Sequence, residues 1–302
     1  MRASLRDRLK SWPRLYASLR SIRDVKRRAL RRREGEKELR RGYLETYGRD
    51  PDIDRPHGFS DKVFRRLVLM NRSLDTRFTR FADKYLVREY VAQTVGHNYL
   101  SELYWQGLNP AEIPFDRLPK DYVIKTNHGS GYNIIVNGPI DRDAVIDRLR
   151  SWQRENYYWR FREYQYYDIR PRILIEEYLD DGQDGGPLDY RIWCFDGRVP
   201  LIQVDNHRHD INAFYDGEWN RLDLYTRDTA PQVSIPKPAN LDEMIAVATA
   251  LSADFDFVRV DLFNLNGRIC FGEMTFTPSA GRRPFKPEHW DTQLGDQWTM
   301  TA

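Results

Sequence analysis

Two carboxylates near the C-terminus, Asp261 and Glu273, lie on either side of a strong turn signal. The segments 257–263 and 268–275 alternate in strand fashion, and Asn266-Gly267 between them is typical of a β-hairpin. Strand periodicity places Arg259 on the face of Asp261, and Thr275 on the face of Glu273. Carboxylates among Phe, Val and Ile need a partner or a metal, and Mg²⁺ prefers oxygen ligands. The stretch therefore favours a metal site; an exposed hairpin face with an ordinary Arg–Glu pair is the alternative.

The length of the hairpin loop decides whether the two carboxylates share a face. A two-residue loop would pair Asp261 with Gly272 and send Glu273 to the opposite face, because a slip of one residue inverts every side chain. A three-residue loop, 265–267, would pair Arg259 with Glu273 and make the carboxylates diagonal neighbours about 7–8 Å apart. Gly267 would then take the left-handed position. We expect the three-residue loop.

Two further segments have the composition of a nucleotide site. Lys125 ends a strand-like run and is followed by Gly129-Ser130-Gly131, which offers a cation and accessible N–H groups to a phosphate. Its spacing matches neither a Walker loop nor G-x-G-x-x-G, and a hairpin turn with a surface lysine is the alternative. The run 172–179 passes from a strand into acids, which could face an adenine and a ribose or could simply be solvated.

In their order along the chain, these segments resemble the ATP-grasp superfamily over roughly residues 80–285. The closest likeness is the TupA-like ATP-grasp family, which is found with bacterial surface-polysaccharide genes. The segments that carry the resemblance are Ala82-Asp-Lys-Tyr85, Lys125-Thr-Asn-His-Gly-Ser-Gly131, Ile175-Glu-Glu-Tyr-Leu179, Asp189-Tyr-Arg-Ile-Trp-Cys-Phe195, Arg259-Val-Asp261 and Phe271-Gly-Glu-Met-Thr-Phe-Thr-Pro278.

The resemblance implies an α+β fold in which two subdomains clasp ATP, and it implies a role for each matching residue. Lys84 and Lys125 would hold phosphates, under a loop of Gly129, Ser130 and Gly131. The adenine hinge would consist of Glu176, Glu177, Tyr178 and Leu179. Asp261 and Glu273 would bind Mg²⁺, or Mn²⁺ in its place. Thr275 stands where many ATP-grasp enzymes have Asn, so it offers a hydroxyl as the third ligand.

Cations and imidazoles around these motifs suit the transfer of a phosphoryl group, in which charge neutralisation dominates. Arg259 is the first candidate for stabilising the transferred group, and Arg191 and Arg208 are further candidates for this role. His207 could take a proton from an amine or orient the acceptor, although a histidine in a polar loop is often surface decoration. We expect the acceptor to meet the remaining candidates, His209, Ser279, Arg282 and Arg283.

The activity implied by the resemblance is an ATP- and Mg²⁺-dependent carboxylate–amine ligase that proceeds through an acyl phosphate. Its substrate would be a uronic-acid-containing surface polysaccharide or its precursor, joined to an amine or amino acid. A kinase that phosphorylates a sugar or glycan precursor is the alternative. A third possibility is a non-catalytic ATP-binding module, against which the retained Asp261, Glu273 and Arg259 argue.

The elements that position these residues divide the 302-residue chain into four predicted parts. They are a basic helical arm (1–42), a helical region (43–118), an N-subdomain (119–180) and a C-subdomain (181–302). Strands are expected near 122–125, 172–177, 190–195, 201–204, 257–263 and 268–275, and helices near 144–156 and 241–253. Cys194 and Cys270 lack metal-ligand spacing and are interpreted as buried free thiols.

The arm is strongly basic, with sixteen Lys or Arg against five acids over residues 1–41, a net +11. Leu, Trp and Tyr recur in it at helical spacing, which fits an anionic membrane surface or a stripe packed on the protein itself. No nucleic acid is expected, because the aromatic side chains follow the apolar face. Without an apolar run of about 20 residues or a secretory leader, we expect a cytoplasmic protein, peripheral on the inner membrane face if the arm binds lipid.

Overall fold

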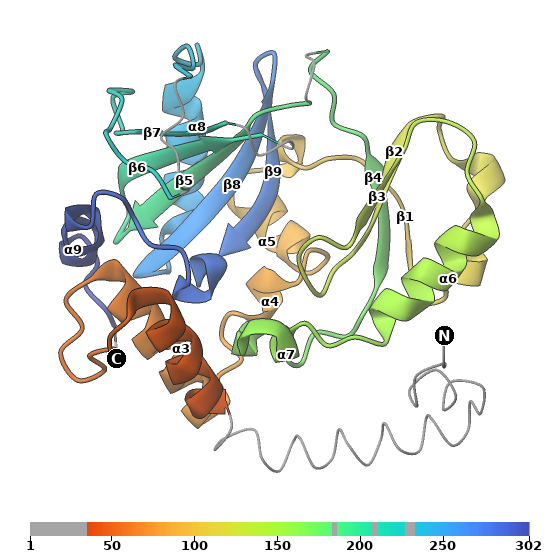
Figure 1. The fold of residues 1–302 in the computed structure, drawn as a ribbon. Coiled ribbons are helices and arrows are strands. Elements are labelled where there is room, and N and C mark those ends of the chain that lie inside the picture. The colour runs from red at the N-terminus through yellow and green to blue at the C-terminus, as the bar shows by residue number, and fades with distance from the viewer. Residues whose placement is uncertain (1–34, 183–185, 207–210, 227–232, 302) are drawn as a thin grey trace, which may run out of the picture.

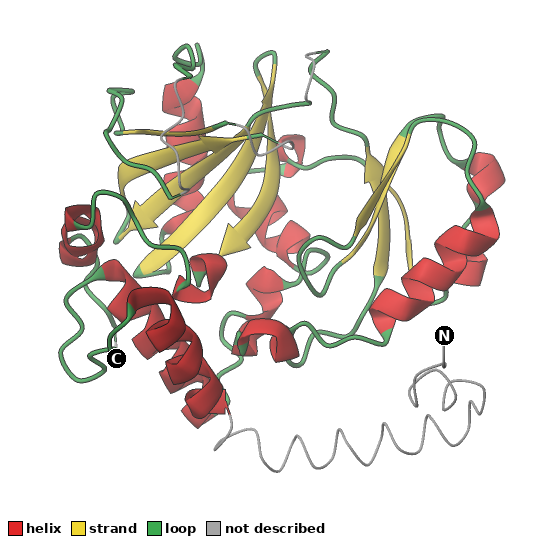
Figure 2. Ribbon diagram, viewed as in Figure 1, coloured by secondary structure: helices red, strands yellow, loops and turns green. Residues whose placement is uncertain are grey.

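The structure, a computed structural model, describes residues 35–182, 186–206, 211–226 and 233–301. Two antiparallel sheets stand side by side, each covered by helices (Figures 1 and 2). The predicted arm over 1–42 lies almost wholly outside the described residues, of which 35–47 are helical. Among the described helices, none is long and apolar enough to cross a membrane.

The first sheet has four strands in the order β1-β4-β2-β3, which are β1 Leu103–Gly107, β4 Ile173–Glu177, β2 Tyr122–Thr126 and β3 Asn133–Val136. Helix α6 (Arg142–Gln153) packs Val145 and Leu149 against Ile124 and Ile173 of this sheet. Asp141 caps α6, because its carboxylate accepts the Ala144 N–H at 3.0 Å. The region 43–118 was expected to be helical, yet β1 lies within it and pairs with β4.

The second sheet has five strands in the order β7-β6-β5-β8-β9, which are β7 Asn212–Tyr215, β6 Arg198–Asp205, β5 Asp189–Phe195, β8 Phe257–Leu265 and β9 Arg268–Thr275. One face is apolar throughout and packs on α8 (Leu241–Ser252) and α5 (Val87–Thr94). The six predicted strands and two predicted helices are all present, whereas β1, β3 and β7 were not predicted.

The other face of the five-stranded sheet changes character along its strands. At one end Trp193, Phe195 and Phe257 pack under α3 (Phe59–Ser73) and the C-terminal segment that carries α9 (His289–Asp296). Further along the same strands, alternation brings Arg191 and Asp261 to that face. The buried aromatic cluster is therefore followed, along the same strands, by charged side chains. In Figure 1, β8 and β9 are the strands of this sheet drawn nearest the first sheet.

Three short helices complete the described fold, and the cysteines are buried as predicted. Helix α4 (Thr79–Ala82) and α5 lie between the sheets, and α7 (Tyr158–Phe161) precedes β4; the remaining turns are 3₁₀ helices at 97–99, 110–112, 115–117, 164–166 and 278–281. Cys194 and Cys270 are free and buried.

Candidate active site

The hairpin that carries the two carboxylates has a two-residue turn, so the predicted three-residue loop is wrong. Asn266 and Gly267 both have positive φ (52° and 103°), as a type I′ turn requires, and Leu265 pairs with Arg268. The ladder is regular as far as Leu262–Phe271 and then shifts, because Gly272 is an extra residue. This β-bulge brings Asp261 directly opposite Glu273. The carboxylates therefore share a face, by a different route from the expected one.

Gly272 allows this bulge because the two strands approach closely there. A Cβ at this position would lie 3.0 Å from the Asp261 carbonyl oxygen and 3.2 Å from Cε2 of Phe263. Such contacts would force the neighbouring backbone to shift, so a residue without a side chain is favoured.

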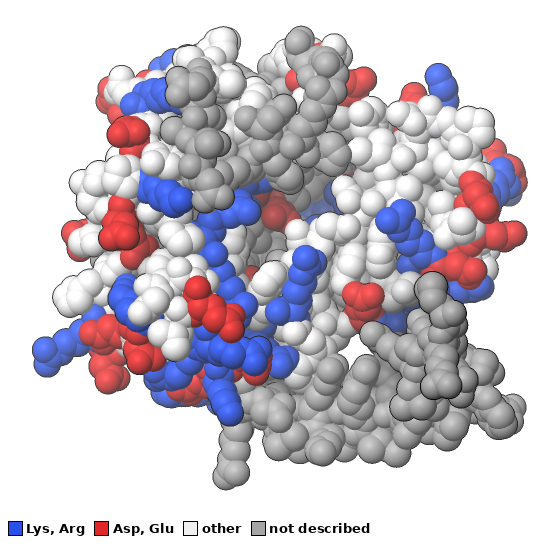
Figure 3. All heavy atoms as spheres, in the orientation of Figure 1, with Lys and Arg blue, Asp and Glu red and all other residues white. Residues whose placement is uncertain are grey.

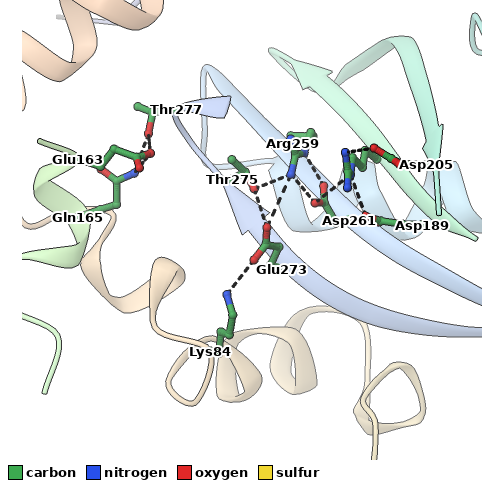
Figure 4. Close-up of polar contacts among 11 residues, drawn as sticks. Lys84, Glu163, Gln165, Asp189, Asp205, Arg259, Asp261, Glu273, Thr275 and Thr277 are labelled. Carbon is green, nitrogen blue, oxygen red and sulfur yellow. Dashed lines mark hydrogen bonds and ion pairs between the residues drawn. The ribbon is translucent and has the colours of Figure 1, made fainter. Parts of the chain in front are cut away.

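Arg259 binds Asp261 with a two-pronged hydrogen-bonded ion pair (Figure 4). Its Nε and Nη2 donate to the two Asp261 oxygens at 2.7 and 2.5 Å, and Nη2 also donates to Thr275 Oγ1 at 3.1 Å. Burial, opposed by Arg259 and reinforced by the carboxylate of Asp189, raises the pKa of Asp261 to about 7. Because burial makes the ionised form of Asp261 unfavourable, a further cation beside it would stabilise its negative charge.

Glu273 forms an ion pair with a lysine from outside the sheet. Lys84, which follows α4, donates from Nζ to Glu273 Oε2 at 2.8 Å (Figure 4). Burial alone would raise the pKa of Glu273, but Lys84 and Arg259 together lower it to about 2. The chain around Lys84 is fixed, because the Lys84 N–H donates to the Asn127 carbonyl and Asn127 Nδ2 donates to Asp83.

Arg191 on β5 is the second guanidinium of this face. It donates to Asp189 and to Asp205, each at 2.8 Å, and lies 3.9 Å from Asp261. Guanidinium groups and carboxylates thus alternate across β5, β8 and β9. Arg191 and Arg259, the two described arginines that were predicted to be catalytic, lie together beside the predicted metal carboxylates.

The first sheet places Lys125 and the Gly129–Gly131 loop across from these groups. A Cβ on Gly129 would lie 2.8 Å from ring carbons of Tyr132 and Tyr157, and Gly131 has a φ of 77°, so both positions favour glycine. The backbone N–H groups of Gly129, Ser130 and Gly131 donate to no acceptor within the described chain. They are available to an anion.

The predicted adenine hinge combines a buried ion-pair network with an exposed edge. The Glu176 carboxylate is 3% exposed and binds Lys125 Nζ at 2.5 Å and Arg88 at 3.2 Å. Glu177 binds Arg268 of the other sheet at 2.5 and 2.7 Å. The two carboxylates therefore hold cations, while Tyr178 and Leu179 line the cavity beyond them.

A cavity of about 890 Å³ lies between the sheets and brings most of the predicted residues together. Figure 3 shows this hollow, with basic and acidic side chains inside it. All nine residues predicted to bind nucleotide line it, as do Arg191, Asp261 and Glu273. Sequence reasoning missed other lining residues, including Val123, Asp189, Asn206 and Phe263. For Val123, Asp189 and Phe263 the available signal was a position two residues from Lys125, Arg191 and Asp261 on the same strand, and therefore on the same face.

The predicted acceptor residues separate from one another. Ser279 and Arg283 line a second, smaller cavity that also contains Arg191 and Arg259. Arg282 instead lies over the Phe161 ring, 5.4 Å from its centroid, and against residue 42. His207, Arg208 and His209 lie outside the described residues.

The donor set fits Mg²⁺ shared with phosphate oxygens. No group of three or more His, Cys, Asp or Glu side chains in the described part of the chain could hold a metal alone. Asp261 and Glu273 face each other on the bulged hairpin, and the Thr275 hydroxyl is 3.4 Å from Glu273 Oε1. Mg²⁺ often takes only one or two carboxylates and completes its shell with phosphate and water oxygens.

A sequence model of the TupA-like ATP-grasp family matches residues 64–299, and no curated protein matches the chain. Similar solved structures include the Helicobacter pylori D-alanine–D-alanine ligase, which is 17% identical over 81% of this chain and 71% of that one, with a TM-score of 0.47.

Two others are more distant. The Bacillus anthracis D-alanine–D-alanine ligase complexed with ATP is 18% identical over 69% of this chain and 55% of its own, with a TM-score of 0.39. The ATP-grasp ligase PsnB complexed with a minimal precursor, Mg and ADP is 12% identical over 74% and 64%, with a TM-score of 0.37. The chain thus spans little more than half of the Bacillus anthracis ligase. On the family match, the chain belongs to the TupA-like ATP-grasp family, and its paired α+β halves are an ATP-grasp fold.

Proposed function

We propose that the protein is an ATP- and Mg²⁺-dependent ligase that joins a carboxylate to an amine through an acyl phosphate. The observation that carries this proposal is the bulged hairpin, which aligns Asp261 and Glu273 on one wall of the large cavity. Lys84, Lys125 and the free N–H groups of the Gly129–Gly131 loop line the same cavity. Cations and carboxylates meeting in this way suit a nucleotide triphosphate with its metal.

ATP would lie with its phosphates between the two sheets. Lys84 and Lys125 hold the phosphates in this proposal and exchange their present partners, Glu273 and Glu176, for phosphate oxygens. Glu176 keeps Arg88 as its cation after the exchange. At the other end of the cavity, Tyr178 and Leu179 would face the adenine.

Asp261 and Glu273 would hold the metal, with the Thr275 hydroxyl as a third candidate ligand. Once Lys84 moves to phosphate, the Glu273 carboxylate is released for this task. Mg²⁺, or Mn²⁺, would neutralise charge that develops on the transferring phosphoryl group. Arg259 holds Asp261 in place through both of its oxygens.

In the proposed reaction an oxygen of the acid attacks the γ-phosphorus, and ADP leaves. The amine nitrogen then attacks the acyl carbon, inorganic phosphate leaves, and the nitrogen loses a proton. Arg259 and Arg191 supply positive charge beside the transferring group, where fixed charges contribute most. Arg208, His207 and His209 stay predictions for the acceptor side.

For the substrate we propose a uronic-acid-containing surface polysaccharide or its precursor, with an amine or amino acid as the second reactant. The support is the polysaccharide context of the family that the sequence resembles. Residues 1–41, with their net charge of +11, would hold the enzyme at an anionic membrane surface in the cytoplasm. Co-sedimentation with phosphatidylglycerol vesicles but not with phosphatidylcholine vesicles tests this last point.

A substrate screen tests the reaction itself. Nucleotide-activated uronic acids are combined with amino acids, and ADP release and product mass are recorded. Release that needs both acid and amine, with loss of one water in the product, supports the ligase; a phosphorylated sugar supports the kinase. Asp261→Asn and Glu273→Gln should abolish turnover, whereas Asp147→Asn, at an exposed carboxylate of α6, should not. Full turnover in the first two would refute the proposed site.

A further inference from the structure

A second cavity, of about 40 Å³, shares Arg191 with the large one and has a more basic lining. The large cavity is lined by both acids and bases. The small one is lined by three arginines and, among the described residues, by no Asp or Glu. Its walls are Tyr47, Phe59, Ser60, Arg191, Trp193, Gln203, Thr226, Arg259, Pro278, Ser279, Gly281, Arg283 and Phe285.

Gln203 gives this cavity a buried polar group that nothing in the described chain satisfies. Its side chain is 4% exposed, and its amide forms no hydrogen bond with a described residue. In the ladder Gln203 lies opposite Arg191 and so shares its face of the sheet. Buried side-chain amides are normally paired, so this amide calls for a ligand.

Arg191 and Arg259 each have one terminal nitrogen that is not used by their carboxylate and hydroxyl partners. Arg259 binds Asp261 and Thr275 through Nε and Nη2, and Arg191 binds its acids through Nε and Nη1. Arg259 Nη1 and Arg191 Nη2 donate to no described residue. Arg259 is only 9% exposed, so its remaining donor is available chiefly inside the protein.

The volume of the small cavity and the geometry of its guanidinium groups limit which chemical group can occupy it. A water needs about 10–15 Å³ of such space, so the cavity of about 40 Å³ takes about three to four water-sized groups, which is enough for a carboxylate. Carboxylates accept several charge-assisted hydrogen bonds at once and match guanidinium geometry. A whole sugar ring would not fit.

The loop over this cavity is held in an unusual conformation. Ser279 and Ala280 both have a φ of 52°, and the Tyr47 hydroxyl donates to the Gly281 carbonyl at 2.8 Å. Left-handed conformations are unfavourable for such residues and cluster where ligands bind.

We infer that the small cavity is the subsite for the carboxylate of the acid substrate, and this inference rests on the proposed ligase function. The carboxylate enters first, held by the Gln203 amide, Arg283 and Arg259, while the rest of the acid stays outside. Because Arg191 borders both cavities, one carboxylate oxygen is directed toward the phosphates of ATP. That oxygen forms the new bond to the γ-phosphorus as the bond to ADP breaks.

Crystals of the full-length protein soaked in sodium acetate test the subsite without ATP. The expected result is acetate in the small cavity, with its oxygens on the Gln203 amide and on Arg259 Nη1. Acetamide, which has the same shape and no charge, should be absent at the same concentration. Water alone in the acetate-soaked cavity, or equal occupancy by acetamide, would overturn the inference.

Two variants of Gln203 and one matched control sharpen the result. Gln203→Glu places a carboxylate at the subsite and Gln203→Leu removes the amide, so both should lose acetate. Gln297→Glu, beside Arg198 and outside both cavities, should keep it. Acetate retained in both Gln203 variants would also refute the subsite. Mg·ATP binding, measured separately by calorimetry, tests the proposed function, so either can fail without the other.

Discussion

Replacing Asp261 by Asn should separate the stability of the ATP-free protein from its response to Mg·ATP. The side chain is 4% exposed, and burial, against the attraction of Arg259, raises its pKa to about 7 from an ordinary value near 3.8. The raised pKa means that the ionised carboxylate is unfavourable in the folded protein. Asn removes that charge and keeps the shape.

The size of the effect follows from the shift. Three pKa units correspond to roughly 4 kcal/mol, an upper limit for the gain in unfolding free energy of Asp261→Asn at pH 8. A raised pKa leaves the wild type without penalty below about pH 4, and the penalty grows as the pH rises to 7. The variant should therefore match the wild type at pH 4 and exceed it at pH 8, as measured by urea unfolding.

Mg·ATP should act in the opposite direction, because it stabilises the wild type and not the variant. At 100 times its Kd the ligand stabilises the wild type by about 2.7 kcal/mol, which raises Tm by roughly 4 °C for a chain of 302 residues. Asp261→Asn should show no such rise, while Asp147→Asn should show all of it. An undiminished rise in Asp261→Asn would refute the metal role. A loss of several kcal/mol without ATP would show instead that the carboxylate serves chiefly as a partner of Arg259.

Three other changes have defined outcomes. Gly129→Ala puts a Cβ within 2.8 Å of Tyr132 and should weaken ATP binding about tenfold or more in calorimetry, with circular dichroism unchanged; unaltered affinity would contradict the phosphate role of the loop. Burial raises the pKa of Glu163 to about 7, so its contribution to the free energy of unfolding falls as the pH rises from 4.5 to 7. Glu163→Gln should therefore raise the free energy of unfolding by up to ~3 kcal/mol at pH 8 and leave it unchanged at pH 4, as measured by urea unfolding. An equal gain at both pH values would refute the shift. Asp256→Asn leaves the buried Arg66 without its partner and should cost about 3–5 kcal/mol in the same assay, against a negligible change in Asp147→Asn.

The strands of this protein could be predicted because their side chains alternate and their turns carry Gly and Asn. The bulge at Gly272 could not, since that residue lies in a run that is equally compatible with a regular strand. The predicted loop was one residue too long, and the real hairpin adds its extra residue in the strand instead. Both arrangements put Glu273 on the face of Asp261, so the shared face was predicted correctly although the register was wrong.

The sequence did not show ion pairs between residues that are far apart along the chain. Glu176 looked like a hinge acid, but Arg88 and Lys125 converge on its carboxylate from other elements. Lys84 reaches Glu273 across 189 positions of sequence. The sequence does indicate Gln203, because it is a polar residue at an alternating position in an apolar strand. Only the packing shows that its amide has no partner among the described residues.

The central claim is that Asp261 and Glu273 hold Mg²⁺ on the phosphates of ATP. A crystal structure of the full-length protein with Mg²⁺ and a non-hydrolysable ATP analogue tests it most directly. We expect oxygens of both carboxylates at about 2.0–2.1 Å from the metal, with Lys84 moved from Glu273 to a phosphate oxygen. A nucleotide bound in the cavity with its metal on other residues, and with Lys84 still on Glu273, would contradict the account.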